Sequence, residues 1–254
     1  MVPNYRFSAR LHYVSSKNDY PPEKCSITFT EGHPDILNAV YNYTHRLDPN
    51  TDLNYTQRAE ALKFFVHFIG DLHQPLHLTG RFRGGTAAYA LFEGRKASLH
   101  SIWDSRILLK RINELQQNAS SASDYYEESV DYEPYINHII TMMSKTWRLQ
   151  KKSWVTCAQE MVQSSAESDQ LPFHGDDMEM NAPIPPMSPI ACASYWSQYV
   201  NKLNCEFVWD GFEKGKELGE GDYYNRIRES YLIEKLLGMA GYRMAAVLNA
   251  LFVE

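Results

Sequence analysis

Five residues between positions 67 and 104 have the types and spacing of a metal site. His67 and Asp71 lie four residues apart, as do His100 and Asp104, and His77 stands between the two pairs. On a helix, residues four apart project from one face, so each pair would present an imidazole beside a carboxylate. Zinc binds both kinds of group in proteins. The spacing therefore predicts two helices that bring metal ligands together.

The residues around the first pair are almost all apolar. They are Leu62, Phe64, Phe65, Val66, Phe68, Ile69 and Leu72. A helix that is apolar on all sides is buried, and an ionised aspartate inside it needs a partner. One pair alone would most simply be a histidine bonded to an aspartate in a core. Two pairs and a further histidine in one short stretch favour a metal site instead.

The sequence predicts a mainly α-helical single domain that positions these residues. One metal helix is expected at 57–71, ended by Pro75, and the other from Ser98 or His100 to about Leu115. Between them, Glu93 and Gly94 separate two short apolar runs and indicate a β-hairpin near 86–99. Further helices are predicted at 33–46, 134–165 (one helix or two), 190–207 and 223–251. Loops are predicted at 48–56, 80–85, 118–131 and 170–189.

Composition limits the classes of protein to which the chain can belong. Of the 254 residues, 44% are hydrophobic, which is enough for a packed core. No apolar run approaches the roughly 20 residues that a membrane helix needs. The net charge of −6 argues against a broad basic surface for nucleic acid. Phosphate chemistry stays open, because bound zinc would supply local positive charge. We expect one domain over residues 1–254, without a repeat.

The metal stretch resembles a known family. FFVHFIGDLHQPLH at 64–77, GGT at 84–86 and SLHSIWD at 98–104 are similar, in identity, order and spacing, to motifs of the zinc-dependent single-strand nucleases and 3′-nucleotidases of fungi and plants. The resemblance covers nearly the whole chain after about Leu11. It implies a helical fold like that of the bacterial zinc phospholipases C, with a cluster of three zinc ions.

The resemblance also implies roles for single residues. Leu11-His12-Tyr13-Val14 is similar to a family motif whose histidine binds zinc. His12, His67 and Asp71 would then hold the inner zinc site, with Asp71 bridging two ions and receiving the attacking water as the catalytic residue. His77, His100 and Asp104 would hold the separate third zinc. His73 lies in the motif at a position that need not be a ligand, and His33 and His45 are expected on the surface.

Three departures from the family pattern bear on activity. An N-terminal tryptophan, a histidine and an aspartate that bind zinc in the family would all precede Met1, so we expect an incomplete inner pair and weak turnover. Among the substrate-binding positions, Tyr13 and Gly85 match the pattern. The base-contacting asparagine is replaced by Thr86 and the base-contacting aspartate by Ser15. Base recognition is therefore expected to differ. Arg81 and Arg83 are interpreted as solvated loop charges that could also meet substrate phosphates.

The cysteines and glycosylation sequons favour the secretory route. The residues alone allow two disulfides or four buried thiols. The resemblance places Cys25 and Cys205 at positions similar to a family cystine, which leaves Cys157 with Cys192. Three sequons begin at Asn42, Asn54 and Asn118. The family is secreted or vacuolar, and no segment of this chain has the layout of a signal peptide.

The functional expectation is a secreted, monomeric zinc hydrolase acting on single-stranded DNA and RNA and on 3′-nucleotides. One alternative is a zinc-binding relative without chemistry. Another is a phospholipase C-like hydrolase on the same fold, which the nuclease-type motifs at 74–77 and 99–104 disfavour.

Overall fold

The chain is mostly helical, as predicted. The computed structural model describes residues 3–119, 131–157 and 190–253. A 3₁₀ segment, Pro3–Arg10, precedes the helices. The helices are α1 (Ile36–Leu47), α2 (Tyr55–Leu72), α3 (Leu99–Ser101), α4 (Ile107–Ala119), α5 (Glu133–Ser144), α6 (Lys151–Trp154), α7 (Ala193–Leu203), α8 (Gly221–Glu229) and α9 (Leu232–Phe252). In the described residues, none of these helices is long and apolar enough to cross a membrane.

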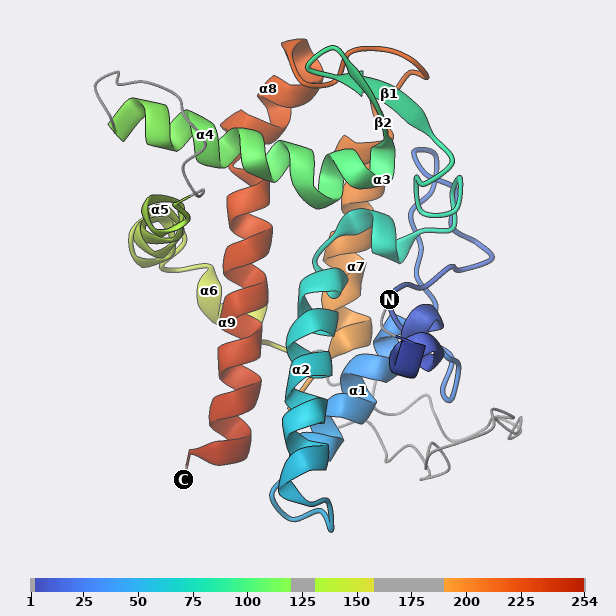
Figure 1. Cartoon of the computed structure of the whole chain (residues 1–254), viewed down its shortest axis with the longest axis vertical. Helices are drawn as coiled ribbons and strands as arrows, with labels where there is room; N and C mark the ends of the chain where they lie inside the picture. The colour runs from blue at the N-terminus through green and yellow to red at the C-terminus, as the bar shows by residue number, and fades with distance from the viewer. Residues whose placement is uncertain (1–2, 120–130, 158–189, 254) are drawn as a thin grey trace.

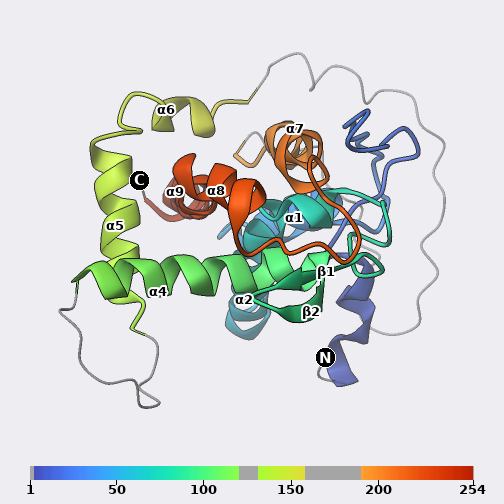
Figure 2. The ribbon, with the colours of Figure 1, turned by 90° about the horizontal axis from the view of Figure 1, so that it is seen from above.

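Helices α2, α7 and α9 run side by side through the middle of the molecule, with α1 against α2 and α7 (Figures 1 and 2). The main core lies among them and is built from large, fully buried side chains such as Phe65, Phe68 and Trp196. Asn54 begins α2 by accepting a hydrogen bond from the amide of Gln57, whose side chain returns one. This reciprocal cap fixes the start of the first metal helix.

Helix α2 is not buried on every side, contrary to the expectation. Leu62 and Val66 are 39% and 45% exposed, and the side chain of His67 is 57% exposed. The reason is that α2 packs against α1 and α9, which leaves its third side in water. The face of α2 that carries His67 is therefore accessible to solvent.

The second metal helix is composite. Ser98, one of the two predicted starting residues, accepts a hydrogen bond from the amide of Ser101 at 3.2 Å. One α-turn, α3, continues into a π-helical stretch, Ile102–Arg106, and then into α4. Such wide turns often mark functional sites. Asp104 lies inside the π-helical stretch.

The hairpin consists of β1 (Tyr89–Phe92) and β2 (Arg95–Ser98), which are antiparallel with Phe92 opposite Arg95. Glu93 and Gly94 have φ of 52° and 73°, as a tight two-residue hairpin turn requires. The backbone at 215–218 runs beside β1 and exchanges two hydrogen bonds with Leu91.

Two predictions about the later helices need correction. The closing helix predicted at 223–251 is two helices, because Tyr231 adopts a left-handed conformation with φ of 51° between α8 and α9. The region predicted as helical at 134–165 does not bury one continuous apolar face, because Trp147 and Trp154 are buried in a small second core but Ile136 and Ile140 are more than half exposed. The predicted loop at 170–189 and most of the one at 118–131 lie outside the described residues.

Two disulfides join distant parts of the chain. Cys25 bonds Cys205 with Cα atoms 5.9 Å apart, and Cys157 bonds Cys192 with Cα atoms 5.8 Å apart. These are the pairs that the resemblance implied.

Candidate metal centre

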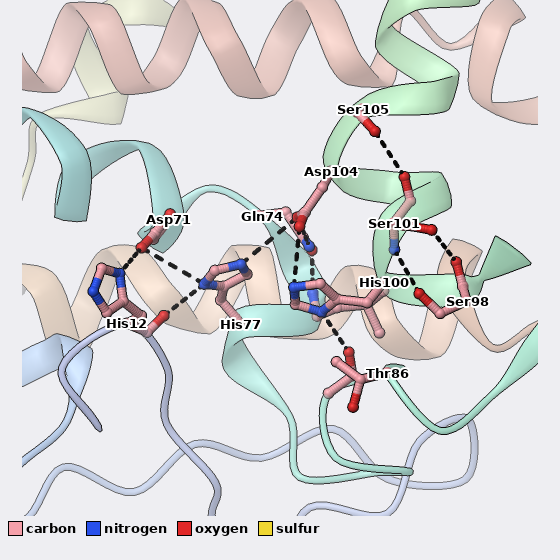
Figure 3. Close-up of polar contacts among 12 residues, drawn as sticks. His12, Asp71, Gln74, His77, Thr86, Ser98, His100, Ser101, Asp104 and Ser105 are labelled. Carbon is pink, nitrogen blue, oxygen red and sulfur yellow. Dashed lines mark hydrogen bonds and ion pairs between the residues drawn. The ribbon is translucent and has the colours of Figure 1, made fainter. Parts of the chain in front are cut away.

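His12, His67 and Asp71 form the first of two candidate ligand groups. Figure 3 shows His12 and Asp71 of this group. Oδ2 of Asp71 lies 2.8 Å from Nδ1 of His12 and 3.2 Å from Nε2 of His67, and the two imidazole nitrogens are 3.1 Å apart. Helix α2 supplies two of the residues one turn apart. His12 comes from the segment after the N-terminal 3₁₀ turn. The structure therefore brings these three predicted residues together.

His77, His100 and Asp104 form the second group. Nε2 of His100 lies 3.1 Å from Oδ2 of Asp104, and Nε2 of His77 lies 3.7 Å from Oδ1 of the same carboxylate. The two imidazole rings stack with centroids 5.0 Å apart. His77 also faces the first group, because its Nδ1 lies 3.8 Å from Oδ2 of Asp71. The two groups are thus neighbours that meet at His77 (Figure 3).

Backbone carbonyl groups orient both imidazoles of the second group. Nδ1 of His77 lies 2.5 Å from the carbonyl oxygen of His12, and Nδ1 of His100 lies 2.7 Å from that of Gly84. A carbonyl can only accept, so each Nδ1 carries a proton and donates it to the backbone. This leaves each Nε2, the ring nitrogen nearest Asp104, as the atom that could bind a metal once it is deprotonated. Zinc-binding histidines are commonly oriented in this way by a backbone carbonyl.

The charges of the second group stabilise one another. Burial alone would raise the pKa of Asp104, but hydrogen bonds from the two histidines and Gln74 lower it far below the usual range. Burial alone would lower the pKa of His77, but the hydrogen bond to Asp104 and the charge of Asp71 raise it. Without a metal, the site therefore favours protonated imidazole beside ionised carboxylate. A bound cation would take the place of that proton.

The turn that carries His77 is fixed from helix α7 and its π-helical end, Asn204–Val208. This 3₁₀ turn, Pro75–Leu78, is held at its start by Asn204, which donates to the carbonyl of Pro75 at 2.6 Å. Asn201 holds its end by donating to the carbonyl of Leu78 at 2.8 Å. The sequence analysis missed both asparagines, although their spacing of three places them on one face of a helix.

Gln74 was also missed as a functional residue. Its Nε2 donates to Oδ1 of Asp104 at 2.6 Å, and its Oε1 accepts from the amide of Leu76 at 2.5 Å. It therefore orients a candidate ligand and starts the turn that carries another. Its place directly before Pro75, in a motif already singled out, was the available signal.

None of the four predicted substrate-binding residues is among the residues that line the pocket at the two ligand groups. Tyr13 is 46% exposed, and Ser15 packs against Gly80 at the start of the loop at 80–85. The carbonyl of Gly85 accepts from the amide of His100 at 3.3 Å. Thr86 is exposed, and its hydroxyl donates to the carbonyl of Arg83 at 2.9 Å. Tyr13 directly follows His12 in the chain, and Ser15 lies two residues further on. Gly85 and Thr86 belong to the segment whose backbone contacts His100.

The remaining histidines of the prediction are placed as expected. His33 and His45 are exposed. His73 is buried with both ring nitrogens engaged, one 2.7 Å from the carbonyl of Ile69 and the other 2.7 Å from a guanidinium nitrogen of Arg243. Burial and the charge of Arg243 lower the pKa of His73 to about 3. It has no nitrogen available for a metal.

Both groups open into one pocket of about 630 Å³. Its floor contains the two aspartates and the four histidines of the groups, and its wall is apolar, with side chains from α4 and α9 such as Leu108, Ile233 and Leu236. Among the lining residues there is no lysine or arginine. A phosphate ester entering this pocket would therefore meet two carboxylates and four histidines of the ligand groups, without a lysine or arginine.

The donor atoms fit zinc. In each group the three ligand atoms lie within 4.8 Å of one another. Tetrahedral zinc with bonds of about 2.0–2.1 Å needs ligand atoms roughly 3.3 Å apart, so small side-chain movements suffice. Three protein ligands with an open fourth position are typical of catalytic zinc. The residues of both groups could each hold one ion.

Comparisons with known proteins agree with this geometry. A model of the family described as S1/P1 nuclease matches residues 2–253. Endonuclease 2 of Arabidopsis thaliana is 25% identical over 98% of this chain and 73% of its own length. Nuclease PA3 from a Penicillium species and nuclease P1 from Penicillium citrinum are each 27% identical over 96% of this chain and 77% of their own lengths. The chain belongs to the S1/P1 nuclease family.

Proposed function

We propose that the chain is a zinc-dependent hydrolase that cleaves phosphodiester bonds of single-stranded DNA and RNA and the phosphomonoester of 3′-nucleotides. One observation carries the proposal most directly. Oδ2 of Asp71 has a ring nitrogen of His12, His67 and His77 within 3.8 Å. A single carboxylate oxygen therefore faces both ligand groups. Family membership and the nucleases among the relatives support the same reaction class.

The residues have separate tasks in this proposal. His12, His67 and Asp71 would hold zinc in the first group, and His77, His100 and Asp104 would hold it in the second. When bound, zinc supplies positive charge for the phosphate oxygens and lowers the pKa of a bound water. Asp71 is proposed as the catalytic carboxylate that orients this water. Gln74 keeps the carboxylate of Asp104 turned towards the two imidazoles.

The lining of the pocket explains why the activity would depend on metal. Its ionisable groups are two carboxylates and histidines, without a lysine or arginine among the lining residues. Its carboxylates alone would offer no attraction for a phosphate ester. Bound zinc reverses the sign of the local charge. The two disulfides also favour an oxidising compartment, which supports the secretory pathway as the place of action.

The test measures metal and turnover in the same samples. We expect His77→Ala,His100→Ala to lose about one zinc per chain, and Asp71→Asn to release acid-soluble nucleotides from single-stranded DNA at least about 100-fold more slowly. The double variant His33→Ala,His45→Ala is the matched control, because both residues are exposed and lie outside the groups. Elemental analysis reports the zinc.

Two outcomes would contradict the proposal. Zinc content unchanged in the His77 and His100 variant would remove the second metal site. A zinc-loaded wild type without turnover on DNA, RNA or 3′-nucleotides would favour the alternative of a zinc-binding relative that lacks chemistry.

A further inference from the structure

The loop at 80–85 contains an unusual run of left-handed residues. Phe82 and Arg83 have φ of 46° and 57°, and Gly84 and Gly85 follow with 61° and 77°. Glycine adopts this conformation easily, but a bulky aromatic residue rarely does. Such backbone strain is concentrated at binding and catalytic sites. The conformation of Phe82 therefore needs an explanation beyond turning the chain.

The strained backbone presents the Phe82 ring to solvent. Its side chain is 54% exposed, although it could be expected in a core. One side of the ring packs on the indole of Trp209, with centroids 5.8 Å apart and planes at 31°. Trp209 itself is 3% exposed. The buried indole thus supports the phenyl ring, while more than half of Phe82 stays exposed to solvent.

Arg81 completes this support. Its guanidinium carbon lies 4.9 Å from the centroid of Trp209 and 5.8 Å from that of Phe82. A guanidinium in such a position is attracted by both rings. Glu23 lies 3.5 Å from Arg81, but its side chain is 75% exposed and the pair is correspondingly weak. Phe82, Trp209 and Arg81 form what we call the aromatic platform.

The platform is continuous with the metal centre. The carbonyl of Gly84, two residues after Phe82, accepts from Nδ1 of His100. Because Phe82 and Gly84 are two residues apart, their Cα atoms are separated by at most about 7.6 Å. The amide of His100 also donates to Gly85. A chain with its phosphate at the second ligand group would therefore pass close to the platform.

Positive charge accompanies the exposed ring. Arg83 is exposed next to Phe82, and within the described parts of the chain no carboxylate lies at ion-pair distance from it. An exposed aromatic face with an arginine beside it suits a base and its backbone phosphate. Bases in a duplex are already stacked, so the arrangement suits single strands.

We propose that the aromatic platform binds the base of a nucleotide adjacent to the one whose phosphate lies at the metal centre, and that Arg83 contacts its backbone phosphate. The inference rests on the proposed function and extends it from the scissile phosphate to a further nucleotide of a single strand. A merely structural role for Phe82 would be to cover Trp209. Leucine would do that equally well, because it is apolar but has no flat face.

A direct binding measurement distinguishes base stacking by Phe82 from a purely structural role in covering Trp209. The zinc-loaded full chain is titrated into a fluorescein-labelled hexathymidylate with phosphorothioate linkages, which are checked for integrity afterwards. We expect Phe82→Ala and Phe82→Leu to raise Kd about tenfold and Phe82→Trp to stay near wild type. Tyr55→Ala is the matched control, because Tyr55 is an aromatic residue 83% exposed at the far end of α2. It should leave Kd unchanged.

The proposed phosphate contact of Arg83 is tested by measuring oligonucleotide binding at several salt concentrations. Removing one phosphate contact from a single strand lowers the slope of log K against log salt by about 0.7. We expect this change in Arg83→Gln. In steady state, Phe82→Ala should raise KM for unmodified hexathymidylate while leaving hydrolysis of a 3′-mononucleotide unchanged, because a mononucleotide has no neighbouring base.

The outcomes distinguish this inference from the proposed function. Phe82→Leu binding as tightly as wild type, or wild type failing to bind the oligonucleotide at low salt, would overturn the platform. Turnover of 3′-nucleotides in that case would leave the proposed function standing. Binding that depends on Phe82, without any hydrolysis by the wild type, would support the platform and refute the hydrolase.

Discussion

Two peptide carbonyls, those of His12 and Gly84, determine which nitrogens the second ligand group offers. Because a carbonyl has no proton to give, it fixes the tautomer of its histidine more firmly than a hydroxyl could. His12 thus has two tasks, since its side chain belongs to the first group and its carbonyl orients His77 of the second. A displacement of either carbonyl group should therefore weaken metal binding, even when no candidate ligand side chain is changed.

Gly84 allows this idea to be tested at the scale of one atom. A Cβ at Gly84 would lie 2.8 Å from the carbonyl oxygen of Leu76, while a Cβ at Gly94 would meet nothing within 4 Å. Both glycines have positive φ, so alanine should cost about 1 kcal/mol at either position. Gly84→Ala should cost about 2 kcal/mol more, because the backbone must also move.

The displaced carbonyl should also release His100. Loss of a hydrogen bond that orients a ligating histidine typically weakens metal binding about 10- to 100-fold. We therefore expect Gly84→Ala to bind zinc more weakly and Gly94→Ala to bind it normally, as measured by competition with a chelating dye. Urea unfolding gives the two stabilities. Equal stability and equal zinc affinity in the two variants would show that the position of this carbonyl is unimportant.

Among the elements, helices and turns were predictable to different degrees. The ligand pairs at 67–71 and 100–104 were predictable, because four-residue spacing depends on local geometry alone. The hairpin was predictable from Glu93 and Gly94, which suit a tight turn. The break at Tyr231 was not, since tyrosine carries no local preference for the left-handed conformation. The exposure of Leu62 and Val66 depends on which helices pack against α2, and periodicity does not contain that information.

The residues that hold the site were harder to predict than the ligands. Asn201 and Asn204 are more than 120 residues from the turn that they bind. Their hydrogen bonds exist only once α7 has packed beside that turn. Ligand chemistry shows in residue types, whereas such support is determined by tertiary contacts. Residue types and spacing therefore predict the candidate ligands, whereas the residues that support them appear only in the fold.

Glu217 is an example of a charged residue that stabilises one element. Its carboxylate accepts from the amides of Glu93 and Gly94 at 2.9 and 2.8 Å, and from the amide of Gly219 at 2.6 Å. Burial alone would raise the pKa of Glu217, but these backbone hydrogen bonds lower it. Because the folded pKa is lowered, the contribution to stability is present above the usual glutamate pKa and is lost as the pH falls through the folded value.

We expect Glu217→Gln to unfold about 1 kcal/mol more easily at pH 7, a modest value because the group is partly exposed. The difference from wild type should shrink as the pH is lowered from 5 to 3. Urea unfolding across this range measures it. Glu213→Gln is the control, since its carboxylate is 69% exposed and pairs with Lys216 on the surface. A gap between wild type and Glu217→Gln that stays constant with pH would contradict the role of the charge.

At the scale of the whole molecule, the metal centre depends on segments that are far apart in the chain. His12 lies near one end, the loop and ligand helices occupy the first half, and α7 with its asparagines comes from the second. The Cys25–Cys205 disulfide joins the segment after His12 to the π-helical end of α7, close to Asn204. It therefore connects the same parts of the chain that the turn Pro75–Leu78 brings together.

The two disulfides should differ in what they contribute. Cys25 and Cys205 are 180 residues apart, whereas Cys157 and Cys192 are 35 apart. On the chain-entropy model the longer loop corresponds to about 5 kcal/mol and the shorter to about 4 kcal/mol, and measured values are usually smaller. Loop length alone thus predicts nearly equal losses. The position of the bonds in the fold predicts a larger loss when Cys25–Cys205 is removed. This disulfide lies next to Asn204, which holds the turn that carries His77.

We therefore expect Cys25→Ser,Cys205→Ser to lose both stability and zinc affinity, and Cys157→Ser,Cys192→Ser to lose chiefly stability. Denaturant unfolding and chelator competition measure the two quantities on each variant, and peptide mapping without reduction verifies the remaining disulfide. The second variant is the matched control, because it also removes one disulfide. If both variants lose zinc affinity equally, the bond acts through overall stability. If neither does, α7 is held beside the turn by its packing and its asparagines alone.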